Sequence, residues 1–70
     1  MKSLTINGVS RPFAPEAMPA TLAELLDELG VAAATVVAEV DGAIVGPERF
    51  GATPLADGQS IELIKFMGGG

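Results

Sequence analysis

The stretch TLAELLDELG, residues 21–30, decides the fold, because all of its local signals indicate one short helix. Thr21 can cap the helix at its start, and Glu24, three residues later, completes a capping box. Gly30 stands where a helix end favours a positive φ angle. One apolar stripe at helical spacing is formed by Leu22, Leu25, Leu26 and Leu29. Such a stripe has to pack on a flat apolar surface, so we expect the flanking segments to supply a sheet.

The segment after the helix has the pattern of a strand that is followed by a tight hairpin. Residues Thr35 to Val40 are rich in β-branched side chains, and the alternate positions are apolar. Asp41-Gly42 is a strong two-residue turn signal, and it leads into a short strand over Ala43 to Val45. These two strands are expected to lie under the helix.

A second hairpin is predicted before the helix. The sequence KSLTING alternates, with Leu4 and Ile6 on one face, and Asn7-Gly8 is again a strong hairpin signal. The return strand runs over about Val9 to Phe13. Pro12 within it has no N–H to donate, which predicts that this strand lies at the edge of the sheet.

The remaining chain is an irregular link and a final strand. The link runs from Glu48 to Gln59 with a turn at Asp57-Gly58, and the strand covers Ser60 to Phe66. A hairpin, a crossover helix and further strands predict an α+β fold of the β-grasp kind. We expect a mixed sheet of four to five strands, with one main helix on one face and the other face open. We expect the 70 residues to form a single domain that includes a flexible glycine tail at residues 68–70.

Composition narrows the class of partner. The chain carries four basic and nine acidic residues, a net charge of −5, and such a domain repels nucleic acid and anionic membranes. No apolar run approaches the ~20 residues that span a bilayer, and the start lacks the pattern of a signal peptide. The absence of cysteine fits a reducing compartment. We therefore expect a cytoplasmic protein with no nucleic-acid or membrane partner.

The residue inventory disfavours a catalytic centre. Without cysteine or histidine, the chain has no thiolate, no imidazole base and almost no way to hold zinc. The acids Glu24, Asp27 and Glu28 share a helix face that is expected to be solvated. The segment GPERF holds Arg49 and Phe50, which either contact a partner or serve the fold. We expect no catalytic residue, no metal and no cofactor bound by the chain itself.

The sequence ends in KFMGGG, residues 65–70, and the three glycines disfavour a role in a core. The α-carboxylate of Gly70 can act as a substrate once its oxygen is made a leaving group, for instance by adenylation with ATP. Glycines without Cβ atoms would let that carboxylate reach through a narrow channel. The alternative is an end without a function.

The strand before the tail predicts a docking surface. If Ile61 and Leu63 face the helix, Ile64 and Phe66 lie on the open face. Together with Met67 they would form an apolar patch at the root of the tail, which is typical of a partner site. The alternative is that the link over residues 48–59 folds across these side chains.

The sequence resembles the ThiS family, the sulfur carriers of thiazole formation in thiamine biosynthesis. The resemblance runs along the whole chain. The segments that carry it, in order, are LTING, TLAELLDELG, VAEVDGAIVGPERF and LADGQSIELIKFMGGG.

The resemblance implies a ubiquitin-like fold and a chemistry for the tail. Gly70 would be adenylated by a ubiquitin-activating-type enzyme that uses ATP and magnesium, and then converted to a thiocarboxylate. The sulfur would come from a cysteine desulfurase or another donor and pass to thiazole synthase. Gly69 with Gly70 matches the diglycine end of the family, and Gly68 adds reach.

Three other functions stay open at this point. The chain could be a related carrier that serves molybdopterin or another thio-metabolite, with the same tail and another acceptor. It could be a ubiquitin-like modifier that forms isopeptide bonds through Gly70. It could also be a binding module whose tail is not used.

Overall fold

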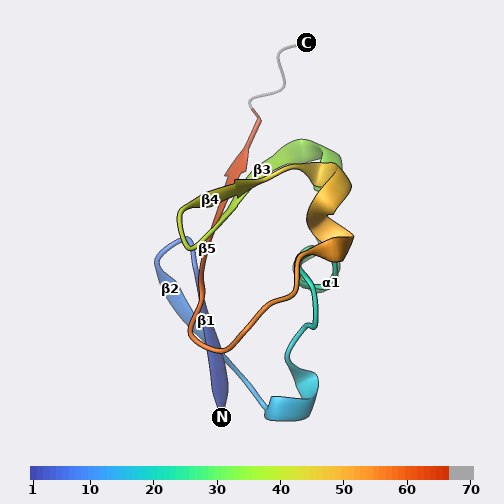
Figure 1. The fold of residues 1–70 in the computed structure, drawn as a ribbon. Helices are drawn as coiled ribbons and strands as arrows, with labels where there is room; N and C mark the ends of the chain where they lie inside the picture. Colours follow the sequence, from blue (N-terminus) through green and yellow to red (C-terminus); the bar gives the residue numbers. More distant parts are fainter. Residues whose placement is uncertain (67–70) are drawn as a thin grey trace.

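Five strands form one mixed sheet in the order β2-β1-β5-β3-β4 (Figure 1). The computed structural model describes residues 1–66. The strands are β1 (Lys2–Ile6), β2 (Val9–Phe13), β3 (Val36–Val40), β4 (Ala43–Val45) and β5 (Ser60–Lys65). One α-helix, α1 (Leu22–Leu29), is accompanied by the 3-10 turns η1 (Pro15–Ala17), η2 (Ala33–Thr35) and η3 (Pro47–Ala52). The predicted α+β fold of the β-grasp kind is confirmed, with five strands and one main helix.

The two predicted hairpins are confirmed at their turns. β1 pairs with β2 and β3 pairs with β4, both antiparallel. Asn7 and Asp41 open the two turns with φ angles of 50°. A positive φ at this position is what a two-residue turn with the twist of the flanking strands requires, and Asn and Asp tolerate it better than most residues. β2 lies at one edge of the sheet, as Pro12 predicted.

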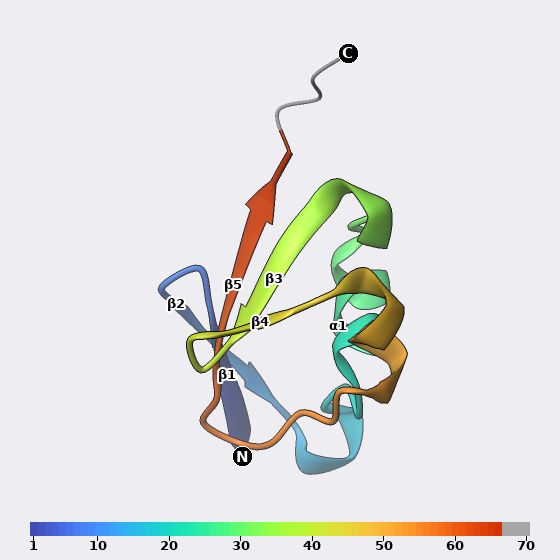
Figure 2. The same cartoon turned by 45° about the horizontal axis from the view of Figure 1, so that its top comes forward.

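The helix begins and ends at the predicted residues. The Oγ1 atom of Thr21 accepts the backbone N–H of Glu24 at 3.2 Å, and Gly30 ends the helix with a φ of 73°. The Glu24 carboxylate reaches back to the N–H of Ala20 at 3.2 Å, one residue before the cap. The helix lies across one face of the sheet (Figure 2).

β5, the last element in chain order, lies at the centre of the sheet. It runs parallel to β1 on one side and antiparallel to β3 on the other. The chain therefore crosses from the β1–β2 hairpin over α1 to the β3–β4 hairpin, and β5 then fills the gap between the two. This arrangement explains why the two hairpins, which share no backbone pairing, form one sheet.

The core lies between α1 and the sheet. Ten buried apolar residues form it: Leu4, Phe13, Leu22, Leu25, Leu26, Val36, Ala38, Val40, Phe50 and Ile61. The helix stripe supplies three of them, and Leu29 packs half-buried against the cluster. The predicted inward faces of β1, β3 and β5 are confirmed by the burial of Leu4, Val36 and Ile61.

The link between β4 and β5 is more ordered than the sequence predicted. Its first part is η3, which contacts α1, and the backbone N–H of Leu22 donates to the carbonyl of Thr53 at 3.0 Å. A single bridge pairs Thr21 with Pro54. The expected irregular link over residues 48–59 is therefore corrected, since its first half is a 3-10 turn that packs beside the helix and leaves the open face of the sheet uncovered.

Candidate docking face at the end of strand β5

The outer side of β5 carries two large apolar side chains that no other part of the described chain covers. Ile64 is 53% exposed and Phe66, directly after the strand, is 55% exposed. Ile61 is fully buried on the opposite side, and Leu63 packs half-buried against the core. The predicted strand faces are thus confirmed, and the alternative that the link folds across Ile64 and Phe66 is wrong.

Two further apolar residues extend this surface over the neighbouring strands. Val37 on β3 lies directly opposite Ile64, and its side chain is half-buried. Ile44 on β4 is 73% exposed and belongs to the same face, since its partner in the register is Glu39. We name these four residues, Val37, Ile44, Ile64 and Phe66, the open-face patch. Exposed apolar surface that spans three strands is typical of a site where another protein binds.

The end of β5 is held firmly in the sheet. Lys65 lies opposite Val36, and the N–H of Phe66 donates to the carbonyl of Thr35 at 2.9 Å. The chain is therefore fixed up to the last described residue, next to the open-face patch. The predicted tail residues Met67, Gly68, Gly69 and Gly70 lie outside the described residues.

Three turn residues complete the backbone pairing of the central strands with their side chains. The Oδ1 of Asn7 accepts the N–H of Leu63 at 2.7 Å, and the Oδ1 of Asp41 accepts the N–H of Ser60 at 2.9 Å. In both cases the backbone N–H of the turn residue donates to a carbonyl of β5, so the side-chain oxygen takes the place of the backbone carbonyl that has turned away.

The third of these residues is Asp57, whose Oδ1 accepts the N–H of Ser3 at 2.8 Å. The carbonyl of Ser3 accepts the N–H of Gly58 at 2.7 Å. The sequence predicted these residues only as turn formers. Their partners are distant in the chain, and only the strand order brings them together. The bonds of Asn7 and Asp41 fix β5, which contributes Ile64 to the open-face patch, and the bond of Asp57 fixes the neighbouring strand β1.

The segment GPERF divides into a core residue and a surface residue. The ring of Phe50 is 2% exposed and packs in the core, so it has no surface to offer a partner, and its candidacy as a contact residue is corrected. The segment is a short turn that contains glycine and proline, so it has no helix or strand periodicity from which the burial of Phe50 could be predicted. Arg49 is exposed, so its side chain is accessible. It belongs to η3, which lies on the helix side of the sheet.

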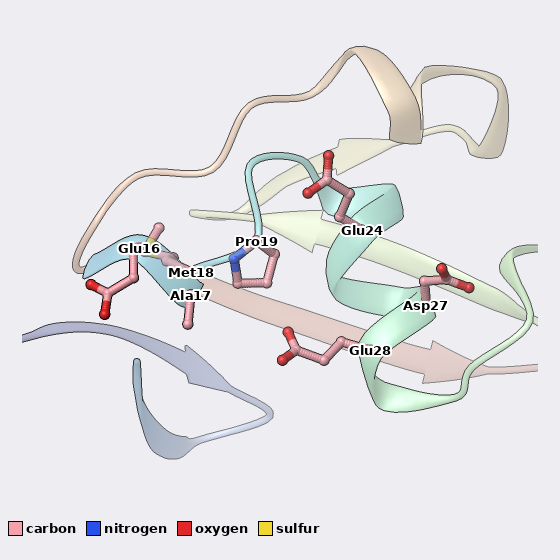
Figure 3. Close-up of a pocket in the computed structure, with 7 residues that line it drawn as sticks. All are labelled: Glu16, Ala17, Met18, Pro19, Glu24, Asp27 and Glu28. Carbon is pink, nitrogen blue, oxygen red and sulfur yellow. The ribbon is translucent and has the colours of Figure 1, made fainter. Parts of the chain in front are cut away.

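A hollow lined by acidic side chains lies between η1 and α1 on the helix side of the sheet (Figure 3). Its acids are Glu16, Glu24, Asp27 and Glu28, and all four are exposed. The Glu24 carboxylate is engaged in the cap of α1, and the others point into solvent, which agrees with the solvated helix face expected from the sequence. Among residues 1–66 no group of three His, Cys, Asp or Glu side chains is arranged to hold a metal ion.

Within the described chain, no helix has the length and apolar character needed to cross a membrane. The described residues thus offer a scaffold with an exposed apolar face, on which another protein can bind.

Comparison with known proteins agrees with this description. The sequence matches the ThiS family over residues 4–70. The fold matches the crystal structure of a thiamine biosynthesis protein (ThiS) from Geobacter metallireducens with a TM-score of 0.79 and 39% identity. That match covers 97% of this chain and 99% of the other.

A solution NMR structure of a thiamine biosynthesis protein from the same organism matches with a TM-score of 0.77 and 39% identity, over 97% of this chain and 87% of the other. No curated protein matches the sequence. The family match spans nearly the whole chain, and the similarity in sequence and in fold extends over the same length. The chain belongs to the ThiS family.

Proposed function

We propose that this chain is a sulfur carrier of thiamine biosynthesis, a protein substrate and not an enzyme. In this proposal an oxygen of the Gly70 carboxylate attacks the α-phosphorus of ATP and displaces pyrophosphate, which leaves an acyl-adenylate. A persulfide on the sulfur donor then displaces AMP from the carbonyl carbon and forms an acyl disulfide. A thiol of the donor system cleaves this S–S bond, which releases the terminal thiocarboxylate and leaves the thiol and the donor sulfur joined as a disulfide. The thiocarboxylate donates its sulfur to the forming thiazole ring.

The observation that carries the proposal is the position of the open-face patch at the root of the glycine tail. A carboxylate that is modified by another enzyme must be delivered into that enzyme's active site while the folded domain is bound outside it. Ile64 and Phe66 lie on the outer side of a central strand that leads directly into the tail. Membership of the ThiS family supports the same function.

The partners are proposed from membership of the ThiS family. The proposed activating partner is a ubiquitin-activating-type adenylating enzyme, which would itself bind ATP and magnesium, so this chain needs no cofactor of its own. A cysteine desulfurase or another donor would supply sulfur, and thiazole synthase would accept it. The reaction belongs in the cytoplasm, where ATP and a reduced sulfur supply are available.

Intact mass spectrometry tests the proposal directly. The full chain is incubated with its adenylating enzyme, ATP, magnesium and a sulfur donor. We expect an AMP adduct without the donor, and a mass corresponding to one oxygen replaced by sulfur with it. Fragmentation should place both changes on Gly70.

A variant that lacks Gly69 and Gly70 is the matched control, because it keeps every described residue. It should bind the adenylating enzyme and gain no mass. If the full chain stays unchanged beside an enzyme that activates another carrier, the proposal fails. Covalent attachment of Gly70 to lysines of other proteins would indicate a modifier instead.

A further inference from the structure

Two glutamates lie directly opposite each other on the open face. Glu39 on β3 is the register partner of Glu62 on β5. The hydrogen bonds from Asp41 to Ser60 and from Phe66 to Thr35 belong to the same ladder. In an antiparallel ladder every second pair of opposite residues is hydrogen-bonded, so the Glu39–Glu62 pair, which lies between these two bonds at that spacing, is also hydrogen-bonded. The Cα atoms of such a pair lie about 5.5 Å apart. Like charges in this position destabilise a sheet.

The basic residues of the chain do not relieve this pair, because they lie elsewhere. Arg11 on β2 is opposite Leu4, and Lys65 is opposite Val36, so the strand alternation places both on the helix side, with Lys2. Arg49 belongs to η3, which contacts α1. Among the strand residues on the open face, Glu39 and Glu62 are therefore the only charged ones.

The glutamates also lie within the area that a docked protein would cover. Glu39 is half-buried and has Ile44 opposite it on β4. The next row of the same face holds Val37 and Ile64. A partner that covers both Ile44 on β4 and Ile64 on β5 has to cross β3 beside Glu39, and Glu62 lies next to Ile64 on the same face. Removing two neighbouring anions from water without a counter-charge is strongly unfavourable.

We infer that the adenylating enzyme docks on the open-face patch and places a cationic side chain, arginine or lysine, between Glu39 and Glu62. This inference rests on the proposed function and specifies the chemistry of its docking surface. The cation would bind both carboxylates, and its aliphatic stem would cover Ile44 or Ile64. The repulsion between Glu39 and Glu62 thus destabilises the free domain, and it favours a partner that brings a positive charge.

The test compares three variants that each remove one negative charge. Glu39→Gln and Glu62→Gln alter the pair, and Glu28→Gln alters the exposed helix face on the other side of the molecule. The dissociation constant for the adenylating enzyme is measured over a range of salt concentrations. We expect Glu39→Gln and Glu62→Gln each to weaken binding about fivefold or more at low salt, and to reduce its salt dependence. Glu28→Gln should bind like the unaltered chain.

A second measurement guards against loss of folding. The midpoint of urea unfolding should stay the same or rise in Glu39→Gln and Glu62→Gln, because each removes the repulsion. The double variant should gain no more than the better single variant. A lower midpoint would show that the carboxylates support the free fold, and it would overturn the inference.

The outcomes separate the inference from the proposed function. If all three variants bind and are adenylated alike while Ile64→Glu is not bound, the function stands and the cation is refuted. Tighter binding of Glu39→Gln or Glu62→Gln would also refute it, as would self-association of these variants with unchanged enzyme binding. If the unaltered chain neither binds nor gains AMP, the proposed function fails, and the inference fails with it.

Discussion

The side chain of Asn7 completes the pairing of β5 at the point where β1 turns away, since its Oδ1 accepts the N–H of Leu63 at 2.7 Å. The N–H of Asn7 donates to the carbonyl of Ile61 at 2.9 Å, as it would in a regular parallel ladder. The turn residue therefore combines a positive φ angle with the last bond of the strand pair. Few residues other than Asn and Asp can do both.

Substitutions at Asn7 should separate these two contributions. Asn7→Asp keeps the acceptor and should retain most of the stability. Asn7→Gly keeps the backbone conformation but loses the bond to Leu63, with an expected loss of about 1 kcal/mol. Asn7→Ala loses the bond and strains the backbone, with an expected loss of about 2 kcal/mol. Urea unfolding measures all three, and equal stability of the Gly and Asp variants would show that the bond contributes nothing.

Phe50 lies in the core and its neighbour Arg49 on the surface, so substitutions at the two positions should change the free energy of unfolding by very different amounts. Phe50→Ala should lose about 3 to 5 kcal/mol, which approaches the whole stability of a domain of this size. Phe50→Leu, which should lose less and still fold, keeps the measurement possible. Arg49→Ala is the matched surface control and should change stability by less than about 0.5 kcal/mol. A Phe50→Leu variant that binds the enzyme more weakly at full stability would restore the contact role.

The open-face patch should matter for binding and not for folding. Ile64→Glu and Phe66→Glu are each expected to weaken binding to the adenylating enzyme at least about tenfold. Both should leave the urea midpoint nearly unchanged, because the side chains are already more than half exposed. Val9 is an exposed apolar residue on the edge strand β2. Val9→Glu therefore serves as the control for adding a negative charge outside the open-face patch. Cooperative loss of structure in Phe66→Glu would mean that this ring supports the core.

The tail should matter for chemistry and not for folding. The ten core residues lie between Leu4 and Ile61, so Gly69→Trp should unfold at the same urea concentration as the unaltered chain. If the tail enters a narrow channel, the indole ring should block adenylation, measured as AMP-adduct formation, while binding of the folded domain persists. Gly69→Ala is the milder control. Normal adenylation of the Trp variant would exclude a narrow channel.

Local signals predicted most of the fold. The helix was predicted residue by residue because Thr21, Glu24 and Gly30 act within one turn of the helix ends. The hairpins were predicted because Asn7 and Asp41 act on their own backbone. The alternation of β5 likewise predicted the exposure of Ile64.

What the sequence could not predict depends on contacts between distant segments. Nothing local places β5 between β1 and β3, and the bonds from Asn7 and Asp57 to backbone N–H groups exist only in that order. The burial of Phe50 required knowledge of how η3 packs on α1. The pairing of Glu39 with Glu62, which are more than twenty positions apart in the chain, needed the register of β3 and β5.

The central place of β5 also bears on the order of events during protein synthesis. The ribosome makes this strand after every other element of residues 1–66, yet β1 and β3 have no shared partner until it arrives. Such long-range closure is slow compared with forming a hairpin or a helix. A nascent chain halted before residue 60 would lack the middle of its sheet, so the domain can complete its fold only after translation has passed through β5.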